Sequence, residues 1–205
     1  MFVMTVDQKA SRRRGDAVPA LLAAVARWTA ERPDGDPFVL PMERTVGDEV
    51  QGVLSEATDV VSLALLLQRL GGWSVGIGAG PVAEPLADTA PASAGEAFVL
   101  ARTAVERARG RAVSVPLAVE GADPASADEA EALLQLLAAV VRRRSDAGWE
   151  VVDLMGRVDT QRAAAERLGI TAQAVSQRLD AALWHEEVRL HPLAARLLRT
   201  AEVAA

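Results

Sequence analysis

The sequence contains no cysteine, and this absence excludes disulfide bonds and thiolate metal sites. Lys9 is its only lysine, so almost all of the positive charge is carried by arginine. No apolar run reaches the length of a membrane span, because Arg, Glu or Gln interrupts every candidate. The run FVMTV near the start is too short for the hydrophobic region of a signal peptide. We therefore expect a cytoplasmic protein that is not embedded in a membrane.

Half of the 205 residues are hydrophobic, which is enough for a real core in one large or two small domains. The formal net charge of −6 argues against a broad, non-specific binder of polyanions. Residues 142–178 differ from the rest of the chain, because seven arginines there face five acidic residues. This local excess of +2 predicts only moderate affinity for phosphates, which a dimer would strengthen.

Residues 160–179 read TQRAAAERLGITAQAVSQRL, a pattern typical of a helix-turn-helix. Ala165 is small, so a second helix can approach the first closely. Gly169 can adopt the left-handed conformation of the turn, which residues with a Cβ resist. Thr171 stands where the second helix needs an N-cap. The apolar seam between the two helices is formed by Ile170, Val175 and Leu179.

The second helix, expected over residues 172–183, is the one that would enter the major groove of DNA. Glutamine pairs with adenine there, arginine pairs with guanine, and alanine or threonine contacts the thymine methyl group. Arg162 on the first helix is expected to hold the phosphate backbone. The residues offered to DNA are Thr171, Ala172, Gln173, Ser176, Gln177 and Arg178. The alternative is a three-helix module that binds protein or forms a dimer.

The chain before this motif alternates strand and helix patterns and predicts an α+β domain over residues 1–120 with a mostly antiparallel sheet. Strands are expected at 2–6, 73–82 and 111–119, a hairpin at 38–54 around Gly47, and helices at 18–28, 58–70 and 96–109. Residues 121–127 read as a linker, with Ser126 and Glu129 resembling a capping box. An all-helical domain is expected over 128–205, with helices near 128–145, 149–155 and 193–203.

Three short motifs of the first domain resemble the palm of class III nucleotide cyclases and GGDEF-type diguanylate cyclases. The first strand ends FVMTVDQ with Asp7, and the hairpin reads RTVGDEVQG with Asp48 and Glu49. The run SVGIGAG over 74–80 matches a further cyclase strand. The resemblance implies a ferredoxin-like palm in which the end of the first strand lies beside the hairpin.

The same resemblance implies that Asp7 and Asp48 hold Mg²⁺, an ion that proteins bind through one or two carboxylates and substrate phosphates. It places a nucleotide near Ser11, Arg12, Arg44 and Arg102, with backbone N–H groups of residues 8–11 around a phosphate. Phe98 stands where cyclases have an essential Asn, so binding is expected over catalysis. Asp48 is also common in tight turns, and Asp7 is also compatible with a simple strand end.

Taken whole, the chain is similar to the SatD-like family of bacterial proteins, which join a palm-like domain to a C-terminal helix-turn-helix. The similarity extends over DQKASR, GDEVQG, GIGAG, GEAFVLAR, WEVVDLM and residues 160–179, in that order. It implies the architecture more than the molecular activity.

These observations predict a sequence-specific DNA-binding transcriptional regulator whose palm senses a ligand, such as a nucleotide, or forms a dimer. A two-fold homodimer would bind a pseudo-palindromic site in double-stranded DNA. One alternative is a divergent, metal-dependent nucleotidyl cyclase. The other is a protein-interaction module in which both sites are vestigial.

Overall fold

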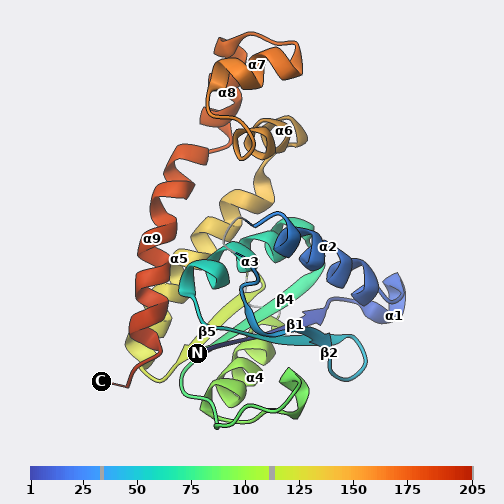
Figure 1. Ribbon diagram of the computed structural model, residues 1–205, viewed down its shortest axis with the longest axis vertical. Coiled ribbons are helices and arrows are strands. Elements are labelled where there is room, and N and C mark those ends of the chain that lie inside the picture. Colours follow the sequence, from blue (N-terminus) through green and yellow to red (C-terminus); the bar gives the residue numbers. More distant parts are fainter. Residues whose placement is uncertain (33–34, 111–113, 205) are drawn as a thin grey trace.

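A computed structural model of the chain describes residues 1–32, 35–110 and 114–204, apart from the Arg12 side chain. A five-stranded mixed sheet has helices on both faces, and a small helical module rises from one end (Figure 1). The strands are β1 (Phe2–Gln8), β2 (Phe38–Arg44), β3 (Glu49–Leu54), β4 (Trp73–Ala79) and β5 (Leu117–Gly121). The helices are α1 (Ser11–Arg14), α2 (Val18–Ala30), α3 (Ala57–Leu70), α4 (Glu96–Ala108), α5 (Pro124–Arg143), α6 (Asp146–Met155), α7 (Gln161–Leu168), α8 (Ala172–Ala181) and α9 (Trp184–Ala201), with a 3₁₀ turn at Ala90–Ala92. The predicted α+β class is confirmed.

The strand order in the sheet is β2-β3-β1-β4-β5. The pairs β2–β3, β3–β1 and β1–β4 are antiparallel, whereas β4 and β5 are parallel and are joined through α4. Asp7 near the end of β1 lies opposite Glu49 on one side and Ser74 on the other. The strand predicted at 111–119 is shifted, since β5 is Leu117–Gly121, and residues 111–113 of that prediction lie outside the described residues.

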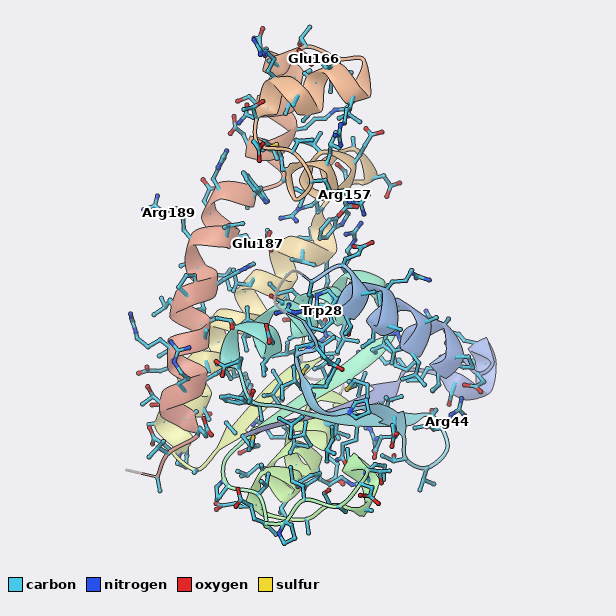
Figure 2. The ribbon with its side chains drawn as sticks, viewed as in Figure 1. Trp28, Arg44, Arg157, Glu166, Glu187 and Arg189 are labelled. Atoms are coloured by element: carbon cyan, nitrogen blue, oxygen red, sulfur yellow. The ribbon has the colours of Figure 1, made fainter. Side chains whose placement is uncertain are left out.

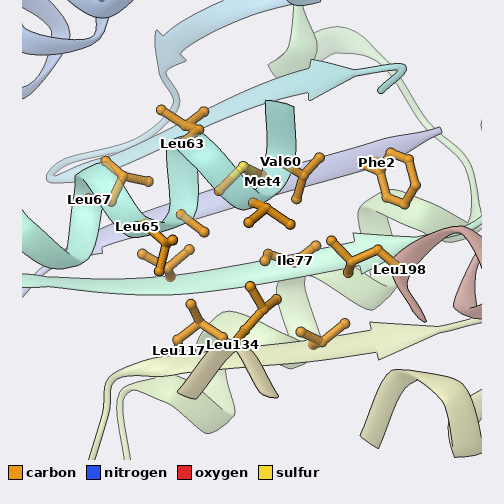
Figure 3. Close-up of a cluster of buried hydrophobic side chains, with 14 of the residues drawn as sticks. Phe2, Met4, Val60, Leu63, Leu65, Leu67, Ile77, Leu117, Leu134 and Leu198 are labelled. Atoms are coloured by element: carbon orange, nitrogen blue, oxygen red, sulfur yellow. The ribbon is translucent and has the colours of Figure 1, made fainter. Parts of the chain in front are cut away.

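The main core lies between the sheet and helices α2, α3, α5 and α9 (Figure 3). Successive strand residues face opposite sides of a sheet, so Phe2 and Met4 on β1 point into this core while Val3 faces α4. Phe2, Met4, Leu63 and Leu134 are fully buried or nearly so. Each such side chain contributes roughly 1.5–3 kcal/mol relative to an exposed one.

The glycines of the GIGAG motif bring α4 close to β4. A Cβ built on Gly76 would lie 2.2 Å from the backbone nitrogen of Val105, and one on Gly78 would lie 2.1 Å from the carbonyl oxygen of Ala97. Real Cβ atoms do not approach backbone atoms this closely, so only glycine fits at either position. The motif therefore serves helix–strand packing, and it fixes where α4 lies beside the end of β1.

The linker predicted at 121–127 is wrong, because β5 runs to Gly121 and α5 begins at Pro124. Asp123 caps α5 by accepting hydrogen bonds from the backbone N–H groups of Ala125 and Ser126, in place of the expected capping box at Ser126. Leu134 of α5 belongs to the same buried cluster as the strands. The predicted domain boundary between residues 120 and 128 therefore lies within a continuous hydrophobic core.

Helix α9 begins at Trp184, well before the predicted start at 193, and it contains Pro192. Proline removes one helical hydrogen bond, but burial of Ala194 and Leu198 in the core shared with α5 stabilises the helix around it. Figure 1 shows α9 running back along α5 toward the sheet. Among the described residues, no helix has the length and apolar character needed to cross a membrane.

Candidate functional site

Helices α6, α7 and α8 form a module with its own small core. Val151, Ala165, Val175 and Leu179 are buried together there. Gly169 ends α7 in the left-handed conformation, with φ 65° and ψ 29°, as the sequence predicted. The left-handed Gly169 therefore allows the short turn between α7 and α8 that the sequence pattern predicts.

Both helices of the pair begin at threonine N-caps. The Thr171 hydroxyl accepts a hydrogen bond from the backbone N–H of Ala174 at 3.1 Å, which confirms the predicted cap of α8. The Thr160 hydroxyl accepts one from the N–H of Ala163 at 3.1 Å and caps α7. Each cap satisfies a backbone donor that the first turn of a helix leaves without a partner. The start of α8 is thus defined locally.

The predicted DNA contacts lie on the surface of this module, away from its core. The exposed residues are Thr171, Ala172, Gln173 and Gln177, while Ser176 and Arg178 are half-buried. Arg162 on α7 is 86% exposed and has only a long 3.8 Å contact with Glu166, one turn further along the helix. Figure 1 shows α7 and α8 at the end of the molecule opposite the sheet, so the body does not cover them.

Arg178 is engaged within the module. Its Nη1 donates to Oε2 of Glu150 on α6 at 2.7 Å, and the two side chains are 33% and 55% exposed. Ion pairs this exposed contribute about 0–1 kcal/mol, so a phosphate or base can replace the carboxylate at small cost.

Arg144 joins the two points at which the chain enters and leaves the module. Its side chain is 1% exposed and donates to the carbonyl oxygen of Ala182, at 2.9 Å from Nη2 and 3.2 Å from Nε. Nη2 also donates to Glu187 near the start of α9. Figure 2 shows Glu187 on the side of α9 that faces α5, whereas Arg189 points away. We call this contact set the Arg144 staple.

A second contact holds α6 against the body. Arg69, at the end of α3, donates two hydrogen bonds of 2.6 Å to the carboxylate of Asp153. The same guanidinium lies 3.7 Å from the ring centre of Trp149, and Arg144 lies 4.4 Å from that centre. These two contacts between cations and one aromatic ring fix the module beside the end of α3.

A cavity of about 790 Å³ lies where β1, the β2–β3 turn and α4 meet. Asp7 comes from β1, and Asp48 and Glu49 come from the turn and the start of β3. Helix α4 contributes Phe98 and Arg102 to the opposite wall. The topology thus brings together Asp7 and Asp48, which lie far apart in the sequence, as predicted.

Two arginines bind the acidic floor of this cavity. Nη2 of Arg109, just beyond α4, donates to Oδ1 of Asp7 at 2.7 Å and to Oε2 of Glu49 at 3.0 Å. Nη1 of Arg102 donates to both oxygens of Glu49, at 3.0 and 2.9 Å. Arg102 also pairs with Glu106, one turn further along α4, at 3.4 Å. The carboxylate that shares Arg109 with Asp7 is Glu49, not Asp48.

The pKa of Asp7 is raised above its ordinary value. Burial is the largest cause, and the neighbouring charges of Asp48 and Glu49 act in the same direction. Arg109 opposes them through its charge and its hydrogen bond. The crowding of three carboxylates is therefore only partly relieved by the arginine.

Two of the three carboxylates at this site, Asp7 and Glu49, are already bound by arginine. Within residues 1–32, 35–110 and 114–204, no three His, Asp or Glu side chains form a group that could hold a metal ion. Asp7 and Glu49 already accept hydrogen bonds from Arg109, so a cation could reach them only by displacing that guanidinium. A magnesium site at Asp7 and Asp48 thus remains a prediction.

The predicted nucleotide residues are not brought together. Arg102 lines the cavity, but Ser11 and Arg44 are not among its lining residues, and the Arg12 side chain lies outside the described part. Arg44 instead pairs with Asp16 at 2.6 Å and donates to the carbonyl of Gly47 at 2.9 Å.

Two of the backbone N–H groups that were expected to surround a phosphate already donate hydrogen bonds within the protein. The N–H of Gln8 donates to the carbonyl oxygen of Asp48 at 3.2 Å, and that of Lys9 to Gly72 at 2.8 Å. These bonds continue the pairing of β1 with its neighbours, so neither donor is left for a phosphate.

Sequence reasoning missed the roles of Glu49 and Arg109. Glu49 stands beside Asp48 in the quoted GDE run, and its position opposite Asp7 in the sheet is the signal that could have identified it. Arg109 carries no local signal, because its partner Asp7 is 102 positions away in the chain.

Comparison of the chain with protein-family models, with curated proteins and with solved structures found no match. The SatD-like resemblance therefore stays a prediction.

Proposed function

We propose that this protein is a sequence-specific DNA-binding transcriptional regulator in which α7 and α8 act as a helix-turn-helix. The observation that carries the proposal is the two-sided character of α8. Val175 and Leu179 are buried in the module, whereas Gln173 and Gln177 are exposed on the opposite side and Thr171 is exposed at the N-cap. A helix that presents an uncovered polar face of this kind suits the major groove.

In this proposal the exposed amides of Gln173 and Gln177 pair with adenine. Arg162 contacts a phosphate on the flank of the motif. Arg178 leaves Glu150 when DNA arrives and contacts either a guanine or a phosphate. The exposure of Gln177 and Arg162 supports these roles, since neither side chain has to be moved out of a core.

The sheet body is proposed to be a ferredoxin-like palm that senses a ligand or forms the homodimer. The antiparallel order β2-β3-β1-β4, with helices between β1 and β2 and between β3 and β4, supports that fold. The large cavity beside Asp7 and Arg102 is where a ligand such as a nucleotide would bind. A two-fold dimer would place two α8 helices on a pseudo-palindromic site.

The test is selection of random-sequence DNA by the purified protein at near-physiological salt, followed by sequencing. Enrichment of one roughly palindromic motif supports a dimeric regulator. The double variant Gln173→Ala and Gln177→Ala should relax base preference, because the amides read base edges. Arg162→Ala should weaken binding to all sequences alike, whereas the matched control Arg199→Ala, near the far end of α9, should change nothing. A folded protein that enriches no motif would contradict the proposal and favour a protein-binding module.

A second candidate function is a divergent nucleotidyl cyclase or related nucleotide-binding enzyme. The cavity that joins Asp7, Asp48 and Arg102 favours it. Phe98 at the wall disfavours catalysis, because an apolar ring cannot donate hydrogen bonds to a developing charge. Incubation with each nucleoside triphosphate and Mn²⁺ tests it, since product formation must be lost in Asp48→Ala.

A further inference from the structure

The acidic floor of the cavity has an occupant from within the chain. Nη2 of Arg109 alone lies 2.7 Å from Oδ1 of Asp7 and 3.0 Å from Oε2 of Glu49, so one nitrogen bridges two carboxylates from different strands. We infer that the Arg109 guanidinium is a built-in cation that takes the bridging place of a divalent metal ion at this site. The inference does not depend on DNA binding by α8.

Burial explains why a cation is required between these carboxylates. The side chains of Asp7 and Glu49 are only 15% and 10% exposed, so water solvates their charges poorly. Register places the two residues directly opposite each other in neighbouring strands, where like charges destabilise the pair. A charged donor between them offsets this repulsion, as a bridging metal ion would.

The guanidinium groups at this site oppose a metal ion at the bridging place. Arg102 adds a second guanidinium to Glu49, so two positive groups already face the three carboxylates of Asp7, Asp48 and Glu49. An incoming divalent ion would meet both guanidinium charges, and Mg²⁺ would require its ligands at about 2.0–2.1 Å. A metal ion that bridges Asp7 and Glu49 would therefore compete with Arg109 for the same oxygens.

The guanidinium also connects three segments. Asp7 lies near the end of β1, Glu49 begins β3, and Arg109 follows the last turn of α4. Arg109 thus fixes the base of the cavity without a metal ion, and any ligand of the cavity meets a floor whose negative charge is already partly compensated.

The experiment is a Mn²⁺ titration followed by electron paramagnetic resonance, which counts free and bound ions. Arg109→Ala should bind one Mn²⁺ at least tenfold more tightly than the unaltered protein, because the bridging place is open. The further change Asp7→Asn should abolish that gain. Arg102→Ala is the matched control: it removes a guanidinium from Glu49 but leaves the bridge to Asp7 in place, and it should gain no site.

A second measurement keeps the inference testable if Arg109→Ala folds poorly. Its melting temperature, or its refolding followed by circular dichroism, should be restored by Mn²⁺ or by methylguanidinium, but not by an equal concentration of Na⁺. Equal Mn²⁺ affinity of the unaltered protein and Arg109→Ala would overturn the inference. So would a variant that neither Mn²⁺ nor methylguanidinium restores. None of these readouts involves DNA, so this inference and the proposed function fail separately.

Discussion

Replacement of Arg144 by methionine tests the staple that holds the module of α6, α7 and α8 on the body. Methionine keeps most of the apolar volume but removes all donors. Glu187, 8% exposed, then loses a charged partner inside the protein, and the carbonyl of Ala182 loses two hydrogen bonds. The contact with the ring of Trp149 is lost as well.

The expected cost follows from the burial of both partners. Removing one member of a buried ion pair costs about 3–5 kcal/mol, because the remaining charge is left without compensation. The remaining hydrogen bond between His191 and Glu187, 3.2 Å long, keeps the cost within this range. Replacing both charges with apolar residues should cost less, about 1–3 kcal/mol, chiefly for the unpaired carbonyl of Ala182.

Urea unfolding of four proteins measures these values: the unaltered chain, Arg144→Met, Glu187→Leu and the double variant. The double variant should be more stable than Arg144→Met alone. Two outcomes would refute the reasoning. One is a loss of less than about 1 kcal/mol in the free energy of unfolding of Arg144→Met, which is the range of exposed ion pairs. The other is simple additivity of the two single changes, which would mean that the charges do not interact.

Three further predictions concern other parts of the molecule. Gly78→Ala should lower the free energy of unfolding by about 3 kcal/mol or more, since its Cβ meets the α4 backbone; Gly156→Ala, with only a 3.6 Å contact, should not destabilise. Glu150→Gln should bind the selected DNA about two- to fivefold more tightly, because it releases the paired arginine of α8; Glu106→Gln on α4 removes the same charge and should not. Burial alone would raise the pKa of Glu187, but hydrogen bonds from its histidine and arginine partners hold it below the ordinary 4.5. The stability that the ionised Glu187 contributes is therefore complete above about pH 4.5 and is lost on acidification. Urea unfolding across about pH 3–7 should show that the free energy of unfolding depends less on acid in Glu187→Gln.

Local features of the sequence predicted local structure well. The turn at Gly169 and the cap at Thr171 depend on a few neighbouring residues, and both have the predicted geometry. The hairpin around Gly47 was likewise predictable, because a glycine between two strand patterns marks a tight turn. Gly47 indeed adopts the left-handed conformation. These features require no knowledge of the rest of the chain.

Features that depend on tertiary packing were not predictable from local patterns. Residues 121–127 look like a linker by composition, but the sheet continues to Gly121 and α5 buries Leu134 against it. The helix at 96–109 was predicted, but nothing local to Gly76 and Gly78 indicates that its backbone packs directly against these two glycines. The contact between Asp7 and Arg109 joins distant parts of the chain, so no spacing rule marks it.

The Arg144 staple marks the two positions between which a whole segment of this chain can be replaced. Because Arg144 touches Ala182, the polypeptide leaves the body and returns to it at neighbouring points. Helices α6 to α8 thus form an insertion between two antiparallel helices, and a short turn from α5 to α9 would restore a continuous helical hairpin. In evolution or in engineering, this helical module can be exchanged as a cassette while the sheet and its cavity stay intact.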